Sequence, residues 1–149
     1  MKNKLFHTRE SYAPLILRLI LGSVVLMHGM QKLLGWFGGF GFSKTMLFFT
    51  ESVGMPWIIG FLVIMLETVG ALSLIAGLGT RVIAAAYVAL PVGMIVTTHF
   101  KNGFFMNWFG TLKGEGYEYF ILWIGMALAL LILGGGKFAA DKIFIKKDL

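Results

Sequence analysis

The sequence predicts an all-α, integral membrane four-helix bundle with a short interfacial helix between spans one and two. Of the 149 residues, 58 % are hydrophobic and only 13 % are charged, and the mean hydropathy is +0.83. Soluble domains carry about 25 % charged residues. Four apolar runs, about 14–34, 57–77, 82–100 and 118–134, approach the ~20 residues that a helix needs to cross a bilayer. We therefore expect residues 1–149 to form one transmembrane domain surrounded by lipid.

The amino-acid composition excludes several kinds of functional site and argues against nucleic-acid binding. The chain has no cysteine, which excludes disulfides, thiol chemistry and cysteine-ligated iron–sulfur or zinc sites. The net charge of +6 is compatible with nucleic-acid binding. However, the basic residues lie mainly at the two ends of the chain, and no basic patch alternates with aromatics. We expect no nucleic-acid partner and interpret the charge as a signal of membrane topology.

The first apolar run carries the polar residues around which we expect the bundle to be organised. At 100° per residue, Lys32 lies about 40° from Arg18 around the helix, and His28 lies about 80° away on the same side. Gly22 and Gly29 fall on the same sector, so a neighbouring helix can approach closely there. Because a charge facing lipid is costly, this polar stripe is expected to face the inside of the bundle.

The later segments follow from length and amphipathicity. Residues 43–53 are too few to span the bilayer, and we expect them to form an interfacial helix capped by Ser43. The second span contains Glu67, and the third ends near His99. A long connection, residues 101–117, is expected to fold back on the headgroup layer or to cap the bundle.

An even number of spans places both termini on one side of the membrane. Basic residues favour the cytoplasmic side, and more of them lie with the termini than opposite. We therefore expect both termini in the cytoplasm. The terminal side holds Lys2, Lys4, Arg9, Arg81, Lys137, Lys142, Lys146 and Lys147, and the opposite side holds Lys32, Lys44, Lys101 and Lys113.

Each residue adds about 1.5 Å of depth from the cytoplasmic end of its helix. This count predicts a set of polar residues near the middle of the membrane. Glu67 lies about 15 Å in, between Arg18 at roughly 6 Å and His28 at about 21 Å, so the arginine is expected to reach toward the carboxylate. Such a pair can simply fix how two helices dock. Alternatively, Glu67 or His28 exchanges protons or hydrogen-bonds a ligand, since ionisable residues inside membranes often serve function.

The same count predicts an outer vestibule. Lys32 and His99 lie about 27–29 Å deep, and Glu118 begins the fourth span on that side, with the histidine of the first span beneath them. Asn107 and Trp108, in the preceding connection, complete the candidate ligand-binding residues. Haem would need two histidines at one depth, and those of spans one and three differ by roughly 7 Å. We expect no metal site.

Four stretches, taken in order, resemble the DoxX family: RLILGSVVLMHGMQKLLG, LETVGALSLIAGLGTR, NGFFMNWFGTLKGEGYEY and GGGKFAAD. Together they reach from Arg18 to Asp141. The last stretch departs from the commoner family form, in which a serine and a leucine precede the aspartate, because Ala139 and Ala140 stand there. The resemblance implies a four-helix protein of the bacterial inner membrane. It also implies a link to oxidoreduction, since some relatives are small subunits of thiosulfate:quinone oxidoreductases and others associate with redox-defence partners.

The first functional hypothesis is the membrane subunit of a quinone-linked oxidoreductase system. A quinone needs a lipid-accessible apolar slot with a few polar groups. His28 and Lys32 would hydrogen-bond one carbonyl, while Glu67 or Glu118 passes protons. Electrons would arrive from a substrate or from a soluble or membrane redox partner protein.

Two further hypotheses stay open. One is a non-catalytic membrane scaffold that recruits a redox partner through its basic tail, where Lys142, Lys146 and Lys147 would equally suit anionic lipid. The other is a small-molecule carrier whose charged stripe lines a path. Four spans are few for a carrier, so it would have to form a homo-oligomer.

Overall fold

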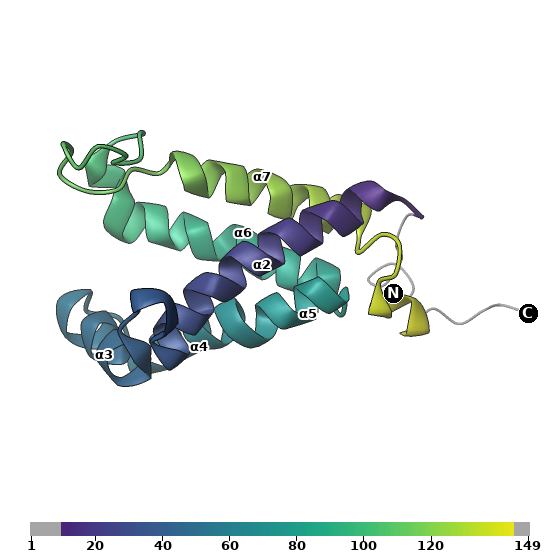
Figure 1. Cartoon of the computed structure of the whole chain (residues 1–149), viewed down its shortest axis with the longest axis horizontal. Coiled ribbons are helices and arrows are strands. Elements are labelled where there is room, and N and C mark those ends of the chain that lie inside the picture. The colour runs from purple at the N-terminus through teal and green to yellow at the C-terminus, as the bar shows by residue number, and fades with distance from the viewer. Residues whose placement is uncertain (1–9, 145–149) are drawn as a thin grey trace, which may run out of the picture.

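The computed structural model describes residues 10–144, and every regular element within that range is helical (Figure 1). Four rods form the bundle. The first is α2 (Tyr12–Leu34); the second joins α4 (Trp57–Met65), η3 (Leu66–Gly70) and α5 (Ala71–Ala76); the third joins α6 (Thr80–Met94), η4 (Ile95–His99) and η5 (Phe100–Asn102); the fourth is α7 (Glu118–Leu133). Short elements connect or close them: η1 (Trp36–Gly38), α3 (Gly41–Leu47), η2 (Phe48–Ser52) and η6 (Ala140–Phe144).

The predicted helical membrane fold is confirmed. Within the described residues, three helical stretches are long and apolar enough to cross a membrane: Tyr12–Leu34, Trp57–Ala76 and Thr80–Asn102. The fourth rod, α7, has 16 residues and is about 24 Å long, so it is shorter than the other three. Large apolar side chains such as Leu122 and Ile132, each 67 % exposed, stand on its outer face. Exposed apolar surface of this extent suits contact with lipid.

The short helix between the first two rods is also confirmed, with different bounds. It comprises α3 and η2, so it runs over residues 41–52, and Phe40 rather than Ser43 precedes it. Ser43 lies inside α3, so the predicted cap is wrong. Met46 is buried, and its Cε would lie 3.4 Å from a Cβ on Gly60 of α4. Leu47 and Phe48 are exposed, as an interfacial segment requires.

α2 packs very closely against the second rod, as its glycines predict. A Cβ at Gly29 would lie 2.3 Å from the backbone oxygen of Glu67, and one at Gly22 would lie 3.2 Å from that of Ala71. Only glycine lets the two backbones approach this closely. α6 and α7 run side by side, and α2 crosses in front of them (Figure 1).

Arg18 does not pair with Glu67, so that prediction is wrong. Its side chain is buried, and it donates from Nε to the Gly135 carbonyl (2.9 Å), from Nη2 to the Lys137 carbonyl (3.1 Å) and from Nη1 to the Ile75 carbonyl. The last turn of a helix leaves carbonyls without intrahelical partners, and a guanidinium offers five N–H donors. Arg18 therefore joins the first rod to the ends of the second and fourth.

Asp141 completes this end of the bundle. Its carboxylate accepts from the backbone N–H groups of Gly79 (2.6 Å) and Thr80 (3.0 Å), at the start of α6. These are N–H groups that a helix N-terminus leaves unpaired. Next to it, a Cβ on Gly77 would lie 2.7 Å from the Cα of Ala139. The GGGKFAAD stretch thus closes the bundle against the turn between the second and third rods.

The two ends of the described chain meet at this same end. Lys137 donates its backbone N–H to the Ser11 carbonyl (3.0 Å), and Lys142 forms an ion pair with Glu10 (2.5 Å). Both ends on one side agree with an even number of crossings. Which side faces the cytoplasm stays a prediction. Among the residues on which it depends, Lys2, Lys4, Arg9, Lys146 and Lys147 lie outside the described residues.

Candidate functional site

A cavity of about 920 Å³ lies among the four rods, toward the end of the bundle opposite the termini. We call it the inter-helix cavity. Most of its wall is apolar, and it also borders η2, the turn that follows η2, and the connection before α7. Four predicted site residues line it: His28, Lys32, Glu67 and His99. Its volume falls within the range of small-molecule sites.

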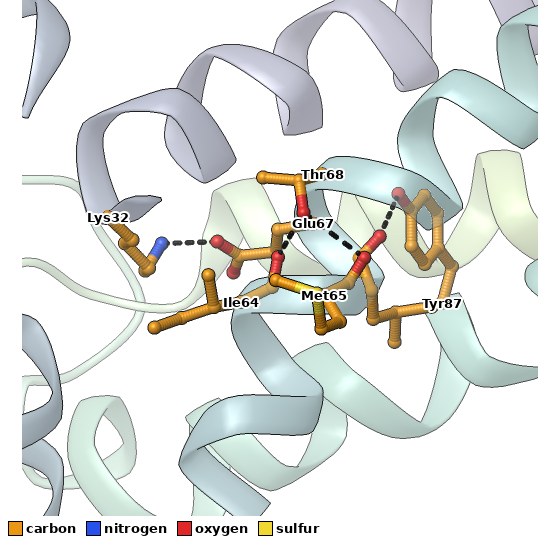
Figure 2. Close-up of polar contacts among 7 residues, drawn as sticks. Lys32, Ile64, Met65, Glu67, Thr68 and Tyr87 are labelled. Atoms are coloured by element: carbon orange, nitrogen blue, oxygen red, sulfur yellow. Dashed lines mark hydrogen bonds and ion pairs between the residues drawn. The ribbon is translucent and has the colours of Figure 1, made fainter. Parts of the chain in front are cut away.

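The central polar contact of the inter-helix cavity is an ion pair between Lys32 and Glu67. The Lys32 ammonium lies 2.5 Å from a Glu67 carboxylate oxygen, as Figure 2 shows. The Glu67 side chain is 1 % exposed and that of Lys32 is 23 % exposed. One charge is therefore almost fully enclosed, and its counter-charge stands at the edge of the cavity.

The depth count had separated these two residues by about 12 Å, so the predicted division into a mid-membrane group and an outer vestibule is wrong. The count treated each helix as perpendicular to the membrane and starting at one plane. In fact α2 crosses the second rod diagonally, with Gly29 against the Glu67 backbone. Lys32 lies one turn farther along, and helical side chains lean toward the N-terminus. Its ammonium thus returns to the level of Glu67.

Glu67 sits in a π-helical turn, η3, which hydroxyl groups stabilise. Thr68 Oγ1 donates to the carbonyls of Ile64 (2.7 Å) and Met65 (3.3 Å), and Tyr87 donates its hydroxyl to that of Leu66 (3.1 Å) (Figure 2). Single π-helical turns inside α-helices occur often at functional sites. The only sequence signal for this arrangement was a threonine and a tyrosine within apolar spans.

The two histidines of the cavity wall come from different rods. His28 precedes Lys32 by one turn of α2, and its ring centroid lies 6.3 Å from that of Tyr119. His99 ends η4 and donates from Nδ1 to the Glu115 carbonyl (2.8 Å). His99 therefore also fastens the connection before α7 to the third rod.

Asn107, Trp108 and Glu118 do not line the cavity. The first two lie in that connection, and Glu118 begins α7 directly after it. A Glu118 carboxylate oxygen accepts from the backbone N–H of Met106 (3.0 Å) and from Trp108 Nε1 (3.3 Å). The Asn107 side chain donates to the Leu112 carbonyl and accepts from its N–H. These three side chains shape the connection, which then places Met106 and Glu115 on the cavity wall.

Sequence reasoning missed three side chains of α7 that line the cavity, Tyr119, Phe120 and Trp123. Two of them, Tyr119 and Trp123, carry a hydrogen-bond donor. Both lie at the start of an apolar run, where aromatic residues are common simply because they mark a membrane interface. Their spacing of four residues, which places them on one helix face, was the available signal.

Comparison with known proteins fits this architecture. The DoxX family profile matches residues 13–100, which is more than half of the chain. The chain belongs to the DoxX family. The matched part of this DoxX protein includes His28, Lys32, Glu67 and His99, whereas α7 lies beyond it.

One relative extends the similarity over α7. "Putative oxidoreductase CatD" of Bacillus subtilis (strain 168) is 29 % identical over 133 residues, which cover 89 % of this chain and 87 % of that protein. No solved structure matches the chain.

Proposed function

We propose that this DoxX protein is the membrane subunit of a quinone-linked oxidoreductase system and that the inter-helix cavity binds the quinone ring. The observation that carries the proposal is the ion pair between Lys32 and the buried Glu67 on the wall of a largely apolar cavity. Charged residues inside membranes are costly and usually mark substrate or proton pathways. The similarity to a protein named as an oxidoreductase supports the same class of function.

The residues of the cavity suit a quinone. Such a ring is flat and apolar and carries carbonyl oxygens, so it needs apolar walls with a few donors. The Lys32 ammonium has three N–H donors, of which Glu67 engages one. A second donor can bind a carbonyl, and His28, one turn away on the same wall, can bind the same group.

Glu67 is suited to hold or release a proton beside the ligand. Its carboxylate is enclosed by the bundle and has one cationic partner, Lys32. A bound quinone supplies the chemistry of reversible electron and proton uptake. The chain lacks cysteine, so it holds no thiol couple, and we assign delivery of electrons to a substrate or a redox partner protein.

We place the protein in the bacterial inner membrane with both termini in the cytoplasm. The bias of basic residues toward the terminal side supports this orientation. The meeting of both described chain ends at one end of the bundle, where Lys142 contacts Glu10, supports placing the two termini on the same side.

The proposal is tested by titrating the purified protein with menadione, a short naphthoquinone, and following tryptophan fluorescence and thermal stability. We expect saturable quenching and a rise in the melting temperature. Glu67→Gln and His28→Ala should each weaken binding by about tenfold, the effect of losing one strong polar contact. If both variants fold and bind menadione as the wild type does, the proposed site is wrong.

A further inference from the structure

Two residues that line the inter-helix cavity carry buried hydrogen-bond donors that lack a partner. The Tyr119 hydroxyl and Trp123 Nε1 are buried, and neither forms a hydrogen bond within the part of the chain that the structure describes. The Trp123 side chain is only 2 % exposed. Buried donors are nearly always paired, because an unmade hydrogen bond in an apolar environment costs free energy. Such an exception in a cavity wall points to a ligand.

A neighbouring enclosed tyrosine that does not line the cavity has its hydrogen bond. Tyr87 is similarly enclosed, contacts Trp123 with ring centroids 5.5 Å apart, and does not line the cavity; its hydroxyl donates to the Leu66 carbonyl. Among the described residues, the other buried side chain without a partner is Thr80, at the start of α6 near the opposite end of the bundle. The unpartnered donors of Tyr119 and Trp123 therefore lie together, apart from Thr80.

The fold holds these two donors on one face. Tyr119 and Trp123 are four residues apart on α7, so one lies above the other, and their rings meet nearly at right angles with centroids 6.1 Å apart. The indole N–H can only donate, and the phenol can donate. A group bound by both must be a hydrogen-bond acceptor, and a carbonyl oxygen of a quinone meets this requirement.

We propose that Tyr119 and Trp123 form a second carbonyl-binding subsite, supplied by α7 and separate from the subsite at Lys32. This inference rests on the proposed function and narrows its ligand class to flat apolar rings with two separate carbonyl oxygens. One carbonyl is bound by α2 and the other by α7. A site built to hydrogen-bond an oxygen strongly rejects an analogue that lacks it.

The experiment measures the binding of two probes to the protein by equilibrium dialysis. The protein is kept in a maltoside detergent, because this detergent has no ester carbonyl that could occupy the site. The probes are menadione and 2-methylnaphthalene, which has the same ring without the carbonyls. Tyr119→Phe and Trp123→Phe keep an aromatic ring and remove one donor each. The matched control is Tyr12→Phe, which removes a hydroxyl from an exposed ring at the opposite end of α2.

We expect Tyr119→Phe and Trp123→Phe each to weaken menadione binding by about tenfold and to leave 2-methylnaphthalene binding within about twofold. Tyr12→Phe should leave the binding of both probes unchanged. If wild-type protein binds menadione more tightly than 2-methylnaphthalene but neither variant changes that preference, the subsite is wrong and the proposed function stands. If the variants weaken the binding of both probes equally, the rings of Tyr119 and Trp123 contribute only packing, and the subsite is wrong. If wild-type protein shows no preference for menadione, the subsite and the proposed function both fail.

Discussion

Gly29→Ala is expected to lower the free energy of unfolding by about 1–3 kcal/mol, the usual cost of forcing extra volume into a packed interface. The added Cβ would lie 2.3 Å from the backbone oxygen and 2.6 Å from the carbonyl carbon of Glu67. Backbone atoms cannot rotate away, so α2 would have to move off η3. The same movement would separate Lys32 from Glu67. Thermal or denaturant unfolding in detergent measures the effect.

Gly125→Ala is the matched control, because a Cβ at Gly125 of α7 meets nothing within 4 Å. Alanine also favours helix by roughly 0.8–1 kcal/mol relative to glycine. This variant should therefore be as stable as the wild type or slightly more stable. Equal unfolding free energies for Gly29→Ala and Gly125→Ala would refute the close crossing of α2 and η3.

Lys32→Met is expected to destabilise the protein by about 3–5 kcal/mol, because it leaves an enclosed carboxylate without its counter-charge. Glu67→Gln should cost less. The lysine it leaves unpaired is 23 % exposed and can extend its long side chain toward a more polar region. The asymmetry between the two variants therefore follows from their difference in burial.

The double variant Lys32→Met/Glu67→Gln tests the coupling directly. With both charges removed, we expect most of the stability lost in Lys32→Met to return, so the two effects should be clearly non-additive. Simple addition of the two single losses would show that the charges do not stabilise the bundle through each other.

The fold could be predicted from the sequence because its signals are local. Four apolar runs of near-membrane length gave the four rods, and the spacing of Gly22 and Gly29 gave the close face of α2. Helix ends were predictable to within a few residues. The capping role of Ser43 was wrong, because this residue lies inside α3 and Phe40 precedes the helix.

The partners within the site could not be predicted in the same way. Arg18 binds backbone carbonyls, which every residue offers and no side-chain pattern reveals. Glu67 meets Lys32 only because two helices cross at an angle that depends on both. Glu118 has side-chain properties suitable for a cavity, yet its carboxylate binds Met106 and Trp108 in the adjoining connection. Such choices depend on the packed arrangement of all four rods.

The most direct test of a quinone in the inter-helix cavity is photolabelling with an azido-quinone in native membranes, followed by mapping of the labelled residues. We predict labels on cavity-wall residues such as Leu66, Met94 and Phe120, lost when excess menadione is present. Labels confined to outward-facing residues such as Leu122 and Ile132, and insensitive to menadione, would contradict the proposal.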